Sequence, residues 1–209
     1  TLTEYTDNNK DKAENKVFYV SDVQQQAQYI KMFKDEGMDA VVLDTRLDVP
    51  YVSFLEAYSG GVKFERIDSA VSEMLKSDSE TEIDTEALEN VFKTALGKDD
   101  LKIKVENLKS ADVSAMIELS EQSRRMQEMS AMYGMDNRTF PSDETLVLNA
   151  NNNVVKLLLD IKDSKNEETE MICRQIYDLA VMSHKPLSQE SMTEFIARSN
   201  KIMELLAEK

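Results

Sequence analysis

The chain has 209 residues, 40 acidic against 25 basic side chains, and a formal net charge of −15 at pH 7. A field of this sign repels phosphate backbones and anionic lipid surfaces, which excludes nucleic acid and membranes as expected partners. A single cysteine, Cys173, cannot form an internal disulfide, and a single histidine, His184, excludes a Ser-His-Asp triad and an ordinary zinc ligand set.

Several features indicate a cytoplasmic protein that was processed or cut from a longer one. The sequence has no apolar run near the roughly 20 residues that span a bilayer, and its polar N-terminus is unlike a signal peptide. It starts at Thr1 without a methionine, which favours processing or a fragment. Cys173 lies in a helical pattern, where we expect it to fill core space, and His184 precedes Pro186, where a helix is expected to end.

The first third of the chain alternates strand and helix patterns. Apolar runs bounded by turn signals, and helical spacing between them, predict three strands and two helices in the order strand 16–20, helix 23–36, strand 39–43, helix 48–57 and strand 62–67. This βαβαβ order predicts a small, largely parallel sheet with helices packed on it. Ser21 and Gln24 have the spacing of a capping box at the start of the first helix. The turn SDVQQQ after the first strand lacks the glycines of a dinucleotide site, so we expect no such cofactor.

A domain boundary is expected where the chain becomes acidic. Residues 68–86 hold seven acids, one lysine and no aromatic side chain, a composition that buries too little apolar surface to order a core. We therefore expect an α/β domain over 1–75, an acidic linker over 76–83 and a second domain over 84–209.

The second domain is expected to be α+β. A helix at 84–97 ending at Gly97 is followed by alternating strand patterns, and two long helices close the chain. The sequence predicts a three-stranded antiparallel sheet, with strands near 101–106, 112–119 and 144–149, followed by a helical hairpin over 166–183 and 188–207. Ser164 and Glu167 have capping-box spacing at the start of that hairpin.

The closing helices carry an apolar stripe at spacings of three and four residues. It consists of Ile172, Ile176, Leu179, Met192, Phe195, Ile196, Ile202, Met203 and Leu206. One interpretation is that these residues cover the domain's own sheet. The other is that a small sheet leaves them uncovered, so that two hairpins pair about a two-fold axis as a four-helix bundle and the protein is a homodimer.

A methionine stripe precedes the last strand. Met126, Met129 and Met132 share one helical face with Tyr133, and no Leu or Val occurs between Gln122 and Asn137. Such a stripe is compatible with a core. Methionine is also flexible and polarizable, and it is over-used where a surface has to fit many shapes, so the second interpretation is an adaptable apolar binding face.

Several long stretches in order resemble the C-terminal part of the ninety-kilodalton heat-shock chaperones, in particular their bacterial form. They are TLTEY, KVFYVSD, AQYIKMFKDEGMDAVVLDTRLDVPYVSFLE, RRMQEMSAMYGM, ETLVLNANN and PLSQESMTEFIARSNKIMELL. The resemblance covers nearly the whole chain. It implies a heat-shock, stress-response chaperone fragment in which residues 1–75 end the middle domain and 84–209 form the dimerisation domain.

The resemblance also implies residue roles. Non-native client proteins would be held at Met126, Met129, Met132, Tyr133 and Tyr51, while the closing stripe would form the four-helix dimer interface. In the full-length family an N-terminal domain binds ATP and Mg, and that domain would lie before Thr1, so the resemblance implies no cofactor and no ATPase activity in this fragment.

Two further hypotheses remain beside the chaperone. Asp44 and Asp48 follow a strand where α/β enzymes place their sites, which is the pattern of a carboxylate-dependent hydrolase, although no base, metal set or nucleophile accompanies them. The other is a purely structural dimerisation module without client contact.

Overall fold

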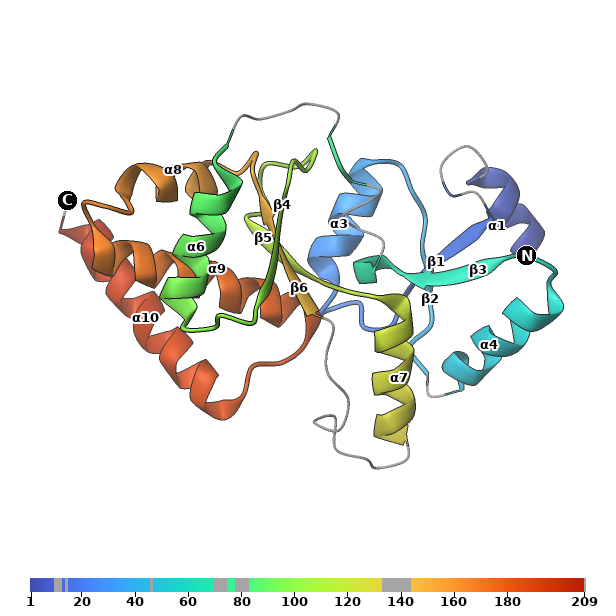
Figure 1. Cartoon of the computed structure of the whole chain (residues 1–209). Coiled ribbons are helices and arrows are strands. Elements are labelled where there is room, and N and C mark those ends of the chain that lie inside the picture. Colours follow the sequence, from blue (N-terminus) through green and yellow to red (C-terminus); the bar gives the residue numbers. More distant parts are fainter. Residues whose placement is uncertain are drawn as a thin grey trace. The chain divides into compact units, whose positions relative to one another are not determined.

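The computed structural model describes residues 1–9, 13, 15–45, 47–69, 75–77, 83–132 and 144–208, with the side chains of residues 49 and 127–132 left out. The fold is mixed α/β with two small three-stranded sheets (Figure 1). The chain forms two compact units, the first made of Thr1–Met74 and Leu119–Asp143, the second of Leu75–Glu118 and Glu144–Lys209. The expected domain limits stay a prediction, to which this division adds that residues 119–143 associate with the first unit.

The sheet of the first unit is parallel. Strand β1 (Lys16–Val20) lies in the middle, with β2 (Val41–Val42) on one side and β3 (Lys63–Arg66) on the other. Helix α3 (Ala27–Asp35) connects β1 to β2, and α4 (Asp48–Tyr58) connects β2 to β3. All four side chains of β1 from Val17 onward are buried, because helices cover both faces of a parallel sheet.

Alternate β1 side chains enter two different cores. Val17 and Tyr19 pack with Val52 of α4 and Phe64 of β3. Phe18 points to the opposite face, where its ring meets that of Phe33 of α3 edge-to-face at 5.1 Å between centroids. The period of two along the strand therefore assigns α4 and α3 to opposite faces of the sheet.

A helix at the N-terminus was not expected from the sequence. Helix α1 (Leu2–Asn8) begins with a capping box between Thr1 and Glu4. Its Tyr5 hydroxyl donates to the Asp39 carbonyl at 2.6 Å and accepts from the Phe18 N–H at 3.1 Å. These two bonds attach α1 to the sheet.

The start of α3 corrects the predicted capping box. The buried Gln26 side chain accepts from the N–H groups of Ser21 and Asp22 at 2.8 and 3.1 Å. The Asp22 carboxylate accepts from the Gln24 and Gln25 N–H groups at 3.0 and 2.9 Å. The turn after β1 is thus closed by Asp22 and Gln26, and the regular helix begins at Ala27, four residues later than predicted.

In the second unit, helix α6 (Thr85–Leu96) has the predicted ends. The Asp84 carboxylate accepts from the Ala87 N–H at 3.0 Å, and Gly97 adopts a left-handed conformation with φ 61°. Glycine takes this conformation without the penalty that a Cβ brings.

The second sheet corrects the antiparallel prediction. Strand β6 (Glu144–Asn149) lies between β4 (Lys102–Glu106) and β5 (Ala115–Leu119), and β4 pairs with β6 in parallel. The Asn149 N–H donates to the Ser114 carbonyl at 2.9 Å, so β6 ends beside the start of β5. The chain reverses direction after β4 and again after β5, so β6 runs in the same direction as β4. Because β6 lies between the other two strands, its pairing with β4 is parallel.

Three helices follow the last strand of this sheet, one more than predicted. Helix α8 (Asn153–Ile161) was missed, and it begins where the Asn152 side chain accepts from the N–H groups of Val154 and Val155. Helices α9 (Asn166–His184) and α10 (Gln189–Ala207) form the hairpin, and α9 ends at His184 as predicted. The predicted Ser164 capping box is wrong, because Lys165 is the N-cap residue and makes no side-chain cap hydrogen bond.

The core of the second unit lies between its sheet, α6, α8 and α9. Its buried residues include Leu88, Phe92, Leu146, Leu148, Val155, Leu158, Cys173 and Ile176. Cys173 is fully buried, as its position predicted, and burial raises the pKa of its thiol to about 12, with a further contribution from the charge of Glu170. The thiol is therefore a core side chain and not a nucleophile.

Part of the expected acidic linker is ordered. The Ser77 N–H donates to the Asn107 carbonyl at 2.7 Å, the Lys109 N–H donates to the Leu75 carbonyl at 2.9 Å, and Leu75 is buried. Residues 75–77 thus pair with the segment after β4. No helix within the described ranges combines the length and apolar character needed to cross a membrane.

Candidate functional site

An exposed apolar stripe runs along α4. It consists of Leu47, Tyr51, Phe54 and Tyr58, which are 77%, 54%, 57% and 82% exposed. Their spacing of four, three and four residues places them on one face of the helix, while Val52 on the opposite face is buried. The rings of Phe54 and Tyr58 stack with centroids 5.6 Å apart. Only Tyr51 of this α4 stripe was predicted as a site residue.

Local bonds fix the start of α4. The Asp48 carboxylate accepts from the Thr45 N–H at 2.7 Å, and Pro50 lies in the first turn, where its missing N–H costs no helical bond. Asp44 is exposed. Asp48, which the hydrolase hypothesis named, therefore closes a turn. The described residues hold no group of three or more His, Cys, Asp or Glu able to bind a metal ion.

The predicted methionine helix is α7 (Glu121–Met132), which belongs to the first unit. Met126 is 42% exposed. The side chains of Met129 and Met132, and Tyr133 as a whole, lie outside the described residues. The first turn is closed by Ser120, whose hydroxyl accepts from the Ser123 N–H at 3.2 Å.

Ionic contacts that the sequence did not suggest attach α7 to α4. Arg125 forms a two-pronged pair with Glu56 of α4, with Nη1 to Oε2 at 2.6 Å and Nη2 to Oε1 at 2.9 Å. Its Nε donates to Oε1 of Glu121 at 2.8 Å. We call Arg125, Glu56 and Glu121 the Arg125 clasp. The neighbouring Arg124 is buried, also bonds Glu121, and lies over the ring of Tyr19 at 5.3 Å.

The clasp perturbs the acidity of its members. Burial by itself raises the pKa of Glu56, but hydrogen bonds from Arg125 and the Phe64 N–H outweigh it, so the pKa lies below the usual range. Burial opposes ionisation of Glu121 in the same way, and the two arginines lower its pKa overall. Hydrogen bonding to Glu56 is the main cause that raises the pKa of Arg125. All three groups are therefore charged at neutral pH, in partly buried positions where screening is weaker than at a free surface.

A cavity of about 610 Å³ opens beside the clasp. Met126 and Phe64 supply apolar walls, and charged side chains surround them. The lining residues are Lys16, Glu56, Lys63, Phe64, Glu65, Glu121, Gln122, Arg125 and Met126. The predicted Met126 thus borders a concave surface.

The closing stripe divides into a covered and an uncovered part. Ile176 is buried in the core of its own unit and Ile172 packs against that core. Met192, Phe195 and Ile202 are half-buried. The uncovered residues are Leu179, Ile196, Met203 and Leu206, which are 46%, 53%, 58% and 66% exposed.

Helix α10 rests on α9 by polar contacts. Arg198 Nε donates to Gln175 Oε1 at 2.9 Å and its guanidinium also pairs with Asp178, while Gln175 Nε2 donates to the Ser199 hydroxyl at 3.1 Å. No residue of the 19-residue helix is buried. A helix of this length without a buried side chain depends on other contacts for most of its stability.

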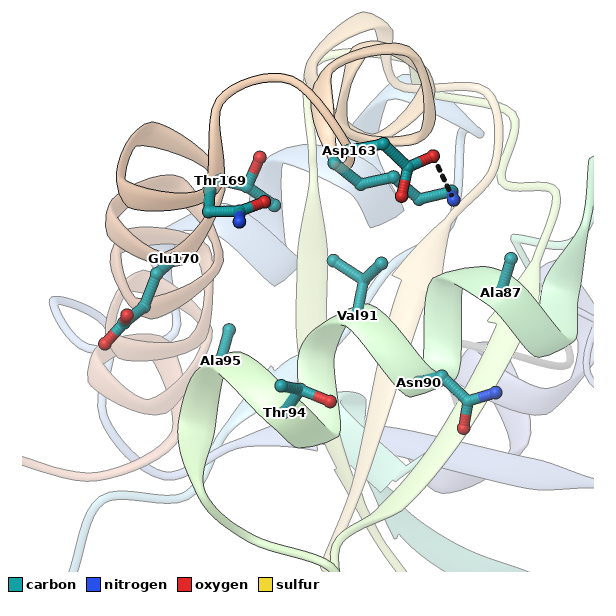
Figure 2. A pocket seen from close by; sticks show the side chains of 10 residues that line it. Ala87, Asn90, Val91, Thr94, Ala95, Asp163, Thr169 and Glu170 are labelled. Atoms are coloured by element: carbon teal, nitrogen blue, oxygen red, sulfur yellow. Dashed lines mark hydrogen bonds and ion pairs between the residues drawn. The ribbon is translucent and has the colours of Figure 1, made fainter.

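A second cavity, of about 570 Å³, lies between α6 and the start of α9 (Figure 2). Asn90 and Thr94 line it from α6, and Thr169 and Glu170 from α9. The Thr169 hydroxyl is buried, with no hydrogen-bond partner among the described residues. Lys162 and Asp163 also line it, and their side chains form an ion pair at 2.7 Å.

No family model matches the chain. It is 32% identical over 174 residues to the "Chaperone protein HtpG" of Bacteroides thetaiotaomicron, which covers 76% of this chain and 25% of that protein. It is also 32% identical over 169 residues to "Chaperone protein htpG" of Bacteroides fragilis, covering 73% of this chain and 24% of that one. The chain belongs to the HtpG chaperone family. This confirms the resemblance found in the sequence, and the chain spans about a quarter of the length of these curated relatives.

Proposed function

We propose that this chain is the part of a stress-response chaperone that dimerises and holds non-native client proteins. Residues 1–75, with their βαβαβ order, are the end of the middle domain, 76–83 are the linker, and 84–209 are the dimerisation domain. We assign the protein to the cytoplasm. We assign the handling of ATP and Mg in the full-length protein to parts outside the region that this chain matches.

The observation that carries the proposal is the apolar surface left exposed on two helices. The α4 stripe has four large side chains with more than half of their surface in water, and α10 adds Ile196, Met203 and Leu206. Isolated apolar side chains are normal on a surface, but contiguous ones mark interaction sites. We therefore assign a separate partner to each of the two surfaces.

For α10 we propose a second copy of the chain. Hairpins of α9 and α10 from two copies, paired about a two-fold axis, form a four-helix bundle that covers Leu179 and the exposed residues of α10. Ile172 and Ile176 support the bundle from inside each subunit, and Met192, Phe195 and Ile202 complete the interface. The family of the relatives and the polar seam between α9 and α10 support this assignment.

For the α4 stripe and α7 we propose non-native clients. Aromatic rings and methionine accept varied apolar segments, since they bury much surface without demanding one shape. Tyr51 and Met126 are exposed on the first unit, and we assign Met129, Met132 and Tyr133 to the same holding surface from their spacing in the sequence. Two copies in a dimer raise the effective concentration of binding surface for one client chain.

The test is suppression of client aggregation, measured by light scattering of a thermally unfolded model protein with the 209-residue chain at equal concentration. Substituting Tyr51→Ser together with Met126→Ser should remove at least about half of the suppression, because each loses about 1 kcal/mol of apolar contact. Lys34→Ser, an exposed position on α3, is the matched control and should suppress as the unchanged chain does.

The alternative is a purely structural dimerisation module. It requires that the unchanged chain dimerises and gives no suppression at any ratio to the client. Full suppression by the doubly substituted chain would show that these residues are not the holding surface.

A further inference from the structure

Strand β3 forms the outer edge of the first sheet, next to α7. The Lys63 N–H donates to the Asn15 carbonyl at 3.0 Å, toward β1. Because backbone groups of a strand alternate in direction, those of Phe64 and Arg66 point away from β1. Such a row of outward N–H and C=O groups is a template for an additional strand.

Side chains from α4 and α7 occupy this row. The Phe64 N–H donates to Oε1 of Glu56 at 2.7 Å, and the Phe64 carbonyl accepts from Nη2 of Arg125 at 2.9 Å. The Arg66 N–H donates to Oε2 of Glu121 at 3.4 Å. All three members of the Arg125 clasp therefore bond the strand edge, and Arg125 also bonds both glutamates.

We propose that Arg125 is a positioning residue for client binding: its guanidinium holds the first turn of α7 on α4 and on the edge of β3, so that Met126 and the cavity beside Phe64 are presented as one surface. The inference rests on the proposed function and adds the way in which a client is bound. A client is held by its apolar side chains on this surface, and not as an added strand on β3, because the clasp occupies the backbone groups that a strand would use.

The geometry requires arginine. A planar guanidinium serves Glu56 with two parallel bonds and still reaches Glu121 and the Phe64 carbonyl, which are four bonds in three directions. A lysine ammonium is a single point donor and cannot reproduce the two-pronged contact. Arg125→Lys therefore keeps the charge and loses the position, which separates geometry from electrostatics.

The experiment compares the unchanged chain with Arg125→Lys, Arg125→Gln and the control Lys31→Gln, which removes a cation from an exposed pair with Asp35 in the same unit. Affinity is measured by fluorescence anisotropy with a permanently unfolded, labelled polypeptide, and amide hydrogen exchange is followed at Phe64 and Arg66. Both Arg125 variants should bind at least about fivefold more weakly and exchange faster at these two amides, whereas Lys31→Gln should match the unchanged chain. Glu56→Gln, which keeps its shape and its acceptor, should show a smaller loss and serves if an Arg125 variant fails to fold.

The outcomes separate the two proposals. If the unchanged chain binds no unfolded polypeptide, the proposed function fails. If it binds, and a folded Arg125→Lys binds equally well while Phe64 and Arg66 lose protection, the clasp only protects the strand edge and the positioning role is overturned. Tighter binding in that variant would mean that clients add to β3 as a strand, which overturns the proposed mode of holding.

Discussion

Removing apolar surface from α10 should weaken the dimer without unfolding the subunit. Ile196 and Met203 are 53% and 58% exposed, and no residue of α10 is buried, so Ile196→Ser with Met203→Ser leaves the core of the second unit unchanged. Full burial of such a side chain is worth about 2 kcal/mol, so the surface still exposed accounts for about 1 kcal/mol per side chain. A dimer loses each side chain twice, which gives about 4 kcal/mol and a dissociation constant about a thousandfold higher.

The measurement is light scattering or sedimentation across a dilution series. Glu194→Ser with Asn200→Ser, two exposed polar positions on the same helix, is the matched control and should dimerise as the unchanged chain does. Circular dichroism and thermal unfolding at high concentration would verify that both variants are folded. A folded Ile196 and Met203 variant with an unchanged dissociation constant, or an unchanged chain that is a monomer at micromolar concentration, would refute the argument.

Three further predictions concern single groups. The Arg125 clasp should stabilise the first unit fully above pH 4.5, the ordinary glutamate pKa, and lose this contribution as the pH falls through the lowered pKa values of Glu56 and Glu121. The free energy of urea unfolding should then no longer differ between the unchanged chain and Arg125→Gln. A difference that persists at low pH would contradict this. Asn149→Ala should lower the free energy of urea unfolding of the second unit by about 3 kcal/mol, because the buried amide bonds backbone groups of Leu108, Ser110 and Val113 that would lose this partner. Asn151→Ala removes a bond to the Leu108 carbonyl and should lower it by about 1 kcal/mol. Cys173, with its pKa raised to about 12, should react with a disulfide reagent at pH 8 only at the rate of unfolding, and rapid labelling of the folded chain would show that the thiol is accessible.

Local patterns in the sequence predicted the elements that carry strong signals. Strand 16–20 is apolar from Val17 onward and was predicted at its exact limits, and Gly97 and His184 marked helix ends correctly. Helix α1 carries the Thr1 and Glu4 capping box and α8 carries the Asn152 cap, so both missed helices had a local signal. The parallel pairing of β4 with β6 had none, because alternation of side chains does not specify which strand becomes the neighbour.

The candidate site was predictable only in part. Tyr51 came from the family resemblance, while Leu47, Phe54 and Tyr58 have the same helical spacing and could have been found from it. The Arg125 clasp could not, because its partner Glu56 is 69 residues away and a charged side chain on a helix is usually solvated. The sequence could not separate the exposed residues of α10 from the buried Ile176, because that difference depends on how α9 packs.

The insertion of β6 between β4 and β5 has a consequence for synthesis on the ribosome. Register pairs such as Lys102 with Thr145 join segments about 40 residues apart, and the first unit likewise needs Leu119–Asp143 in addition to Thr1–Met74. Neither unit can close while only the first hundred residues have left the exit tunnel, because α7 and all three strands of the second sheet follow residue 100. After β4 and β5 have emerged, the second sheet keeps unpaired strand edges until the central strand β6 arrives, and that arrival ends the vulnerable unfinished state.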